Sequence, residues 1–586
     1  NYSLPSQIPG CPDLQSIDSI EVSSTNLQDL LLCFCEKGQS DQVSISCLYG
    51  STPQHLQRAS LAVSNANLTI NQLSIQHMEF TSSGLDSQFL STFTPSLSRL
   101  DIRECAGGQP LVLHNEAFKG LESTLVNITI HDCKLSSIPR AIHSLHQLNT
   151  LILSSNDIQS INKNDLNGKN KLSYLDISGN QITQIEEGSF ESLTNLQSLL
   201  IGDHNYINDT FLQEISRLSS LKLLDLSRAD GIFNPPEELF SHLPMLNTLK
   251  MGGCSLSSLD VGVFSSLGML QQLDLRVNLI ENISSLAFDG LSSLKRLSLA
   301  GNYIRNIDTD YWAGLGSLED LDIGWNELRS IDGDAFASIE SSLQRLHLRH
   351  NPINQLPSLN LPQLTFLSIT ETNISSITFD ALKNLPKLET LEALRSNISS
   401  ISSNAFDSQS NSIKVIQLNS NKLRSFNLSL ESLPSLQELS LSGNPFICDN
   451  HIEHLITNIN EAYQRAAKEG RSFTITNTNE TLCARPWKLK GKSILGLNTT
   501  QLEEYNESLD TTTTNTPSTT TIQSNQVTES ITLPTFTLPD LFAGKDSNES
   551  IFKDDRERLQ YDLTKTDTTH QKDQSDKVSS ILLSIG

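Results

Sequence analysis

The feature that most constrains this chain is one apolar pattern that recurs along it. The pattern is L-x-x-L-x-L-x-x-N-x-I, and the stretch LKRLSLAGNYI from Leu294 is one clear copy. Most copies begin 23 to 25 residues apart, a period typical of stacked repeat proteins. We count sixteen copies, the first of them weak, with starts at Ile70, Leu97, Leu125, Leu148, Leu172, Leu196, Leu221, Leu246, Leu270, Leu294, Leu318, Leu343, Leu364, Leu388, Ile413 and Leu436.

The spacing within a copy predicts a short strand followed by a turn. In L-x-L the apolar side chains alternate with polar ones, so one face of the strand is apolar and the other stays in water. One copy buries almost nothing, whereas stacked copies pair their strands in a parallel sheet, about 4.8 Å per step, and share one core. The ninth position should satisfy turn backbone groups with its amide. It is filled by Asn156, Asn180, Asn278, Asn302, Asn326, Asn351, Asn421 and Asn444.

A Phe recurs six or seven residues before the next start in many copies. We expect these rings to stack as a spine on the convex side of the repeats, with a packing role. They are Phe118, Phe190, Phe240, Phe264, Phe288, Phe336 and Phe406.

In this pattern and period the chain resembles the extracellular leucine-rich repeat family, which includes Toll-type ectodomains, Slit, chaoptin-like adhesion proteins and the small leucine-rich proteoglycans. The resemblance covers roughly residues 11–497. It implies an α/β fold: a leucine-rich repeat solenoid, curved as a horseshoe, with a parallel β-sheet on the concave face and disulfide-bonded caps. It says little about the ligand, because this scaffold serves many partners.

Four cysteines precede the repeats in the order C...C-x-C...C, at Cys11, Cys33, Cys35 and Cys47. Four cysteines allow three pairings, and the spacing does not choose among them. The family's N-terminal flanking cap implies the bonds Cys11–Cys35 and Cys33–Cys47. A zinc site is the alternative, but two ligands one residue apart without a matching second pair argue against it.

After the last repeat, NPFIC at Asn444 and CARPWKLKGKSILGL from Cys483 are similar to the family's C-terminal cap. That cap usually carries four cysteines, and here Asn450 stands where the second would be. We therefore predict a single Cys448–Cys483 bond. The segment between these cysteines has helical spacing and no Pro, so it predicts a helix.

Three further cysteines, Cys105, Cys133 and Cys254, occupy the ninth position of their copies. A small side chain with a weak donor can replace Asn there, so we expect buried free thiols. Cys105 and Cys133 lie in adjacent copies near bonding distance, which makes a disulfide the alternative.

The compartment is indicated by sequons and cysteines together. Twelve Asn-x-Ser/Thr tripeptides and clustered cysteines predict a secreted protein or one on the extracellular face of the plasma membrane. No stretch has the roughly 18 apolar residues of a membrane helix, and without an initiator Met or a leader at Asn1 we expect a processed or excised chain. The sequons are Asn1, Asn67, Asn127, Asn208, Asn282, Asn373, Asn397, Asn427, Asn479, Asn498, Asn506 and Asn548.

We expect four parts along the chain: an N-terminal segment and cap over residues 1–69, the solenoid over 70–443, a C-terminal cap over 444–498, and a disordered tail over 499–586. The tail is rich in Thr and Ser and then in charged residues, with no core-forming pattern. Such a tail would hold a repeat domain away from a cell surface.

The common catalytic motifs are absent from the sequence, so we expect no enzyme, no cofactor and no metal. GKS at Gly491 lacks the leading Gly of a phosphate loop, and HIEH at His451 is not H-E-x-x-H. Function should then lie at positions 3, 5, 7 and 8 of each copy, which face the concave side. Most are small and polar.

The copies from Leu318 to Leu388 differ, since they place Arg and aromatic residues, common interface anchors, on this face. The candidate surface comprises Asp320, Asp322, Trp325, Arg345, His347, Arg349, His350, Phe366, Glu371, Glu392 and Arg395. The rival interpretation is that Arg345 or Arg349 pairs with Asp320, Asp322 or Glu371 as a solvated ladder. A pH response or metal binding by His347 and His350 is a weaker alternative.

The sequence thus favours a non-enzymatic extracellular binding protein of the adhesion, guidance or matrix type. The alternatives are an innate-immune or receptor ectodomain and the non-catalytic subunit of a secreted enzyme. We expect a protein or glycan ligand on the concave or lateral face, and a homodimer is left open. The net charge of -25 argues against nucleic acid and anionic membranes as partners of the whole surface. A glycan at Asn127 would obstruct one end of the concave face and direct the ligand to the C-terminal half.

Overall fold

The structure is a computed structural model that describes residues 33–37, 42–47, 53–80, 84–85, 90, 93, 96–497 and 502–505. By its backbone contacts the chain divides into two compact units. The first comprises Asn1–Ile323 with Ala335–Leu343, and the second comprises Gly324–Asp334 with Gln344–Gly586. Both are built from the repeat that the sequence predicts.

The first unit is a parallel sheet preceded by one antiparallel pair. Strand β1 (Cys33–Lys37) pairs antiparallel with β2 (Gln42–Cys47), and helix α1 (Pro53–Asn65) follows. Every later neighbour in the sheet is parallel, and equivalent repeat positions face each other, as in Leu249 opposite Leu273. The parallel strands are β3 (Thr69–Gln76), β4 (Arg99–Arg103), β5 (Asn127–His131), β6 (Thr150–Ile152), β8 (Tyr174–Asp176), β10 (Ser198–Leu200), β11 (Leu223–Asp225), β12 (Thr248–Lys250), β14 (Gln272–Asp274), β16 (Arg296–Ser298) and β17 (Asp320–Asp322).

The second unit repeats this plan and ends in a cap. Its parallel strands are β18 (Arg345–His347), β19 (Phe366–Ser368), β21 (Thr390–Glu392), β23 (Val415–Gln417), β24 (Glu438–Ser440) and β26 (Thr474–Thr476). Helix α6 (Ile452–Lys468) confirms the predicted cap helix, and Gly470 follows it with a φ of 66°. The strands β25 (Phe446–Ile447) and β27 (Cys483–Arg485) pair beside this helix.

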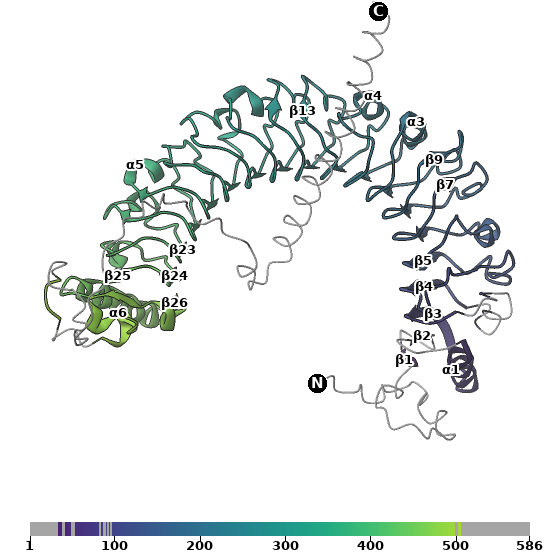
Figure 1. The fold of residues 1–586 in the computed structure, drawn as a ribbon, viewed down its shortest axis with the longest axis horizontal. Coiled ribbons are helices and arrows are strands. Elements are labelled where there is room, and N and C mark those ends of the chain that lie inside the picture. Colours follow the sequence, from purple (N-terminus) through teal and green to yellow (C-terminus); the bar gives the residue numbers. More distant parts are fainter. Residues whose placement is uncertain are drawn as a thin grey trace, which may run out of the picture. The chain divides into compact units, whose positions relative to one another are not determined.

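Short elements lie on the outer side of each unit, opposite the strands (Figure 1). The first unit has helices α3 (Asp209–Ser216) and α4 (Glu237–Phe240), the strand pair β7 (Ser160–Ile161) and β9 (Gln184–Ile185), the pair β13 (Ser258–Leu259) and β15 (Asn282–Ile283), and the 3-10 turns Arg140–Ser144, Thr309–Trp312 and Ala337–Ile339. The second unit has α5 (Phe379–Leu382), the pair β20 (Ser376–Ile377) and β22 (Ser400–Ile401), and the 3-10 turns Asp407–Gln409, Leu430–Ser432, Thr478–Glu480, Trp487–Leu489 and Ile494–Gly496.

The core follows the repeat letters. In most three-residue strands the central side chain is buried and the residue before it is half-buried or exposed, because alternate residues point to opposite faces. The predicted Phe spine is present in the first unit, where Phe240, Phe264 and Phe288 have successive ring centroids 5.6 and 6.2 Å apart. Trp312 takes the Phe place in its copy, 6.3 Å from Phe288, and its Nε1 donates to the carbonyl oxygen of Ala335 at 2.9 Å. The sequence pattern missed this residue, since we searched the position for Phe alone.

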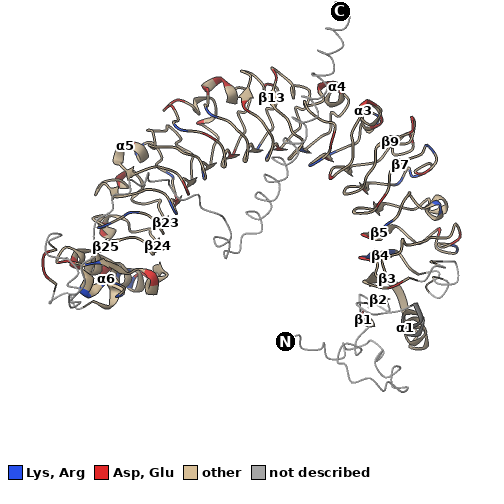
Figure 2. Ribbon diagram, in the orientation of Figure 1, with Lys and Arg blue, Asp and Glu red and all other residues tan. Residues whose placement is uncertain are grey.

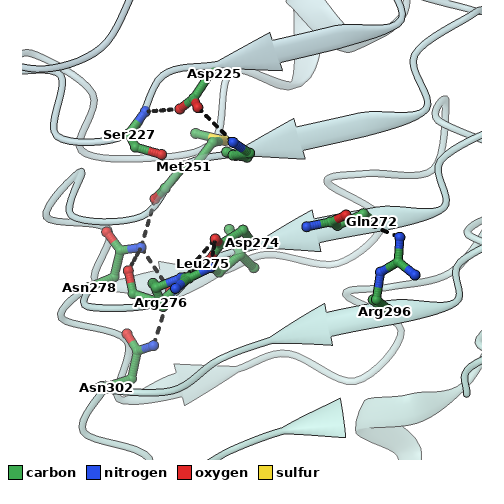
Figure 3. Close-up of polar contacts among 11 residues, drawn as sticks. Asp225, Ser227, Met251, Gln272, Asp274, Leu275, Arg276, Asn278, Arg296 and Asn302 are labelled. Carbon is green, nitrogen blue, oxygen red and sulfur yellow. Dashed lines mark hydrogen bonds and ion pairs between the residues drawn. The ribbon is translucent and has the colours of Figure 1, made fainter. Parts of the chain in front are cut away.

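The ninth-position amides link successive turns. Asn278 is buried, its Oδ1 accepts hydrogen bonds from the backbone N–H of Cys254 and Leu256 at 2.9 and 3.1 Å, and its Nδ2 donates to the carbonyl oxygen of Met251 at 2.8 Å. The Nδ2 of Asn302 donates to the carbonyl oxygen of Leu275 in the copy before it, at 3.1 Å (Figure 3). Backbone groups that the turns would bury unpaired are thereby satisfied.

The disulfides confirm two expectations and correct a third. Cys33–Cys47 and Cys448–Cys483 are bonded as predicted. Cys35 is also in a disulfide, but Cys11 lies outside the described residues.

The expectation of free thiols at Cys105 and Cys133 is wrong, because these residues form a disulfide with their Cα atoms 4.8 Å apart. That separation is the spacing of adjacent strands, so equivalent positions of neighbouring copies come within bonding reach. Cys254 is the buried free thiol that we expected. Burial raises the pKa of its thiol to about 12, so it is protonated at neutral pH.

Candidate binding surface

We call the solvent side of the strands, formed by positions 3, 5, 7 and 8 of each copy, the strand face. Of the predicted surface residues, Asp320 and Asp322 lie on β17 in the first unit. The remaining nine belong to the second unit, which can be described by itself.

Positions 3 and 5 of the second unit carry an aromatic cluster made of Arg345, His347 and Phe366. Arg345 and Phe366 face each other on β18 and β19, and the guanidinium carbon lies 4.4 Å from the centroid of the Phe366 ring. The ring of His347 lies 4.8 Å from the same ring at an interplanar angle of 39°. Arg345 is exposed and the two rings are half-buried, so the cluster combines an ordered arrangement with an accessible surface.

Position 8 carries a second set of contacts, the position-8 ladder, formed by Trp325, His350, Glu371 and Arg395. The rings of Trp325 and His350 are stacked, with centroids 3.5 Å apart. Glu371 has one carboxylate oxygen 3.0 Å from Nδ1 of His350 and the other 3.0 Å from a guanidinium nitrogen of Arg395. Each member lies four residues after the central residue of its strand, and Trp325, His350 and Glu371 each contact the same position of the next copy.

The backbone at position 8 is left-handed throughout the ladder. The φ angles are 54° at Trp325, 55° at His350, 56° at Glu371 and 47° at Arg395. Glycine adopts this conformation most readily, and Gly301 has it at the same position of the first unit, with a φ of 73°. The side chains at this position could be read from the repeat, but their backbone conformation could not.

The ladder bears on the rival interpretation that we left open. Glu371 does pair with an arginine, but the partner is Arg395, 24 residues later at the equivalent position. The Arg345 guanidinium lies over the Phe366 ring. Arg349 is half-buried after β18, and Glu392 ends β21 with a half-buried side chain.

The strand face of the first unit holds oppositely charged pairs that sequence reasoning missed. Lys250 Nζ lies 3.1 Å from Asp225, and Arg276 lies 2.6 Å from Asp274 (Figure 3). The recurrence of Asp at position 5 was the available signal. These pairs leave the face compensated in charge, and Figure 2 shows acidic and basic residues interspersed along the units.

One position-5 acid, Asp176, is instead held by hydroxyl and amide donors. Its Oδ1 accepts hydrogen bonds from the Ser178 N–H at 3.0 Å and from the Ser178 hydroxyl at 2.6 Å. Burial nevertheless raises the pKa of the carboxyl. Burial, followed by the Asp176 charge, also raises the pKa of Tyr174.

The sequons within the described residues differ in exposure. Five have exposed Asn side chains, at Asn67, Asn282, Asn373, Asn427 and Asn479. Asn127, Asn208 and Asn397 are half-buried, and Asn127 begins β5 on the strand face as predicted. Asn1, Asn498, Asn506 and Asn548 lie outside the described residues.

Comparison with known families identifies the repeat. The model "Leucine rich repeat" matches residues 123–182, 146–207, 170–232, 244–304 and 292–353, and "BspA type Leucine rich repeat region (6 copies)" matches 358–463. The chain is a leucine-rich repeat protein. Both matching models describe repeats, and neither describes a catalytic domain.

Its relatives include adhesion-type and receptor-type proteins. It is 27% identical over 210 residues to chaoptin of Tribolium castaneum, covering 34% of this chain and 26% of chaoptin. It is 25% identical over 251 residues to the Oplophorus-luciferin 2-monooxygenase non-catalytic subunit of Oplophorus gracilirostris, covering 43% and 60%. It is 32% identical over 120 residues to Toll-like receptor 2 type-1 of Gallus gallus, covering 20% and 14%. The matched regions thus span less than two thirds of each of these relatives.

Solved structures share the fold at low identity. A TLR13–ssRNA13 complex gives a TM-score of 0.56 at 21% identity, covering 76% of this chain and 65% of that one. The glycosylated Toll–Spatzle complex of Drosophila gives 0.51 at 15% identity, covering 78% and 71%. These likenesses support the α/β leucine-rich repeat solenoid and carry no information on the ligand.

The described residues include neither a membrane-spanning helix nor a cluster of metal ligands. No helix among them has the length and apolar character needed to cross a bilayer. Within the same residues, no three His, Cys, Asp or Glu side chains lie close enough to hold a metal ion.

Proposed function

We propose that this chain is an extracellular, non-enzymatic glycoprotein of the adhesion, guidance or matrix type that binds a protein partner through the strand face of its second unit. The observation that carries the proposal is the aromatic cluster beside the position-8 ladder. Both place aromatic rings, each in contact with a neighbouring ring or guanidinium, at accessible positions, whereas Lys250 and Arg276 of the first unit lie in ion pairs.

The side chains of the aromatic cluster and the ladder are held in place before a partner binds. Arg and aromatic side chains dominate binding energy at interfaces because they bury a large area and still form directional hydrogen bonds. Binding ordinarily costs about 0.5 to 1.5 kcal/mol for each flexible side chain that becomes fixed. Arg345 over Phe366, and Trp325 against His350, are already held by neighbours, so this cost is partly met before a partner arrives.

The ladder contributes little to folding stability, which favours a role in recognition. Exposed ion pairs contribute about 0 to 1 kcal/mol, and the Arg395 side chain is 50% exposed. The left-handed backbone at position 8 also occurs at Ser155, Val277 and Ser420 outside the ladder, so it is a property of the repeat. The ion pairs of the ladder therefore add little to stability, and its large side chains remain accessible.

The test is affinity capture from the native tissue with the secreted protein as bait. Arg345→Ala with Phe366→Ala should weaken capture of the partner by about thirtyfold, which corresponds to about 2 kcal/mol of a hot-spot contact. Arg296→Ala is the matched control, because Arg296 is exposed at the same position 3 of the first unit. Equal capture by the two variants, with unchanged melting temperatures, would refute the assignment to this face.

A second candidate is the non-catalytic subunit of a secreted enzyme complex. It is favoured by the match to the Oplophorus luciferase subunit, which covers a larger share of that relative than the matches to chaoptin and Toll-like receptor 2 type-1 cover of theirs. Size-exclusion chromatography of the native complex separates the candidates: an enzyme activity that co-elutes with this chain, and that the isolated chain lacks, would support the subunit role.

A third candidate is a receptor ectodomain, as the likeness to Toll-like receptor 2 type-1 suggests. Sequencing of the full-length transcript tests it. A membrane helix and a signalling domain downstream of Gly586 would support this role over that of a matrix protein.

A further inference from the structure

The C-terminal cap contains a short segment whose charge is opposite to that of the chain. Residues 485–492 carry Arg485, Lys488, Lys490 and Lys492 and no acidic residue, in a chain of net charge -25. We call this segment the basic loop. Four like charges within eight residues repel one another, and a polyanion that binds them reduces this repulsion.

The basic loop is closed at its base. The backbone N–H of Cys483 donates to the carbonyl oxygen of Lys492 at 2.9 Å, and the N–H of Gly491 donates to the carbonyl oxygen of Cys483, also at 2.9 Å. The bond from Cys483 to Cys448 fixes this base to the end of the repeats. The three lysines of the loop are exposed, so their charges are accessible on a segment whose ends are held by these bonds.

An exposed tryptophan organises two of these cations. The ring of Trp487 is 41% exposed, and the Arg485 guanidinium carbon and the Lys490 Nζ lie 4.4 and 4.1 Å from its centroid. Cation–π contacts of this kind hold the two cations in place while Trp487 stays partly exposed. The loop thus offers positive charge next to an aromatic surface.

We infer that the basic loop binds a linear sulfated polysaccharide of the extracellular matrix. Sulfate groups would contact the exposed lysines, and the Trp487 ring holds Lys490 and Arg485 in place beside them. The rest of the chain is acidic and would repel a broad anionic surface such as a bilayer or a nucleic-acid duplex. A thin polyanion can meet the loop alone. This inference does not depend on the proposed protein binding by the strand face, so a failure of that proposal would leave it unaffected.

A neighbouring carboxylate competes for this site. Glu503 lies 3.0 Å from Lys488 Nζ, and Glu504 is the next residue. A sulfate that binds Lys488 has to displace Glu503. Removing that charge should therefore strengthen polyanion binding, which a merely structural role of the loop would not predict.

The experiment is binding of the purified chain to immobilised heparin, with elution by NaCl. We expect retention of the wild-type chain, about 25-fold weaker binding after Lys490→Gln with Lys492→Gln, at roughly fivefold per lysine, and tighter binding after Glu503→Gln. Lys387→Gln with Lys422→Gln is the matched control, since both lysines are exposed in the repeats of the same unit and the net charge changes equally. Desulfated heparin should bind none of the variants.

Three outcomes would overturn the inference. One is equal elution of the loop variant and the matched control, each with an unchanged melting temperature. Another is equal or weaker binding of Glu503→Gln. The last is binding to phosphatidylserine vesicles as tight as to heparin, which would make the site a membrane contact.

Discussion

The hydrogen bonds of the buried ninth-position asparagines allow a quantitative prediction for Asn278→Ala. The Asn278 amide serves the N–H of Cys254, the N–H of Leu256 and the carbonyl oxygen of Met251 at 2.8 to 3.1 Å, and its side chain is 1% exposed. It also donates to the carbonyl oxygen of Leu275, but that oxygen keeps a hydrogen bond from Asn302. Three groups therefore lose a partner, at about 1 to 3 kcal/mol each.

We expect Asn278→Ala to lower the free energy of unfolding by about 4 kcal/mol. Urea denaturation followed by circular dichroism measures the loss, and amide hydrogen exchange should localise it to residues 251–278. Asn164→Ala is the control, because Asn164 is exposed in the same unit and the change in chain entropy is the same. A loss no larger than that of the control would refute the view that the ninth-position amide secures the turns.

Three further predictions concern other buried groups. Replacing Cys105 and Cys133 by Ser should destabilise the chain by about 3 to 4 kcal/mol by the chain-entropy model for a loop of 28 residues, measured by thermal melting against Cys254→Ser. Iodoacetamide should leave Cys254 unmodified in the folded chain at neutral pH and label it in urea, as mass spectrometry can show, because burial raises its pKa to about 12. Burial lowers the pKa of Lys169 below its ordinary 10.5, so the folded chain holds that proton less tightly than the unfolded chain. The free energy of unfolding should therefore increase as pH rises from the folded pKa of Lys169 to 10.5. Lys169→Met should remove this increase. An unchanged dependence of stability on pH in that variant would contradict the lowered pKa of Lys169.

The repeat letters determine the fold because each has one structural use. Alternation in L-x-L fixes which strand face is buried, and the ninth-position amide fixes the turn, so both could be read from spacing. The disulfide between Cys105 and Cys133 was also readable in principle: equivalent positions of adjacent copies always lie at strand spacing. Cys254 has no cysteine in the copies beside it, where Ala229 and Asn278 occupy the ninth position, and it remains a thiol.

The candidate surface was only partly predictable. Its residues followed from their repeat positions, but the contacts of Glu371 and Trp325 did not, because we considered only Arg345 and Arg349 as partners of Asp320, Asp322 or Glu371. In the structure Glu371 pairs with Arg395 and Trp325 stacks on His350, each time at equal positions of neighbouring copies. Side chains at equal positions of adjacent copies lie one strand spacing apart and can make contact, whereas those at opposite ends of adjacent strands are too far apart. A column-by-column comparison of the copies would have found these contacts.

The left-handed backbone at position 8 has a consequence for the surface of the repeats. The same left-handed backbone occurs at position 8 of other copies, with Ser155 and Val277 as well as Gly301 in the first unit. The conformation therefore belongs to the turn, which accepts a glycine, a small polar residue or a large ring. Position 8 can change its side chain from copy to copy without a change in the turn, so one backbone conformation can display different surfaces along the repeats.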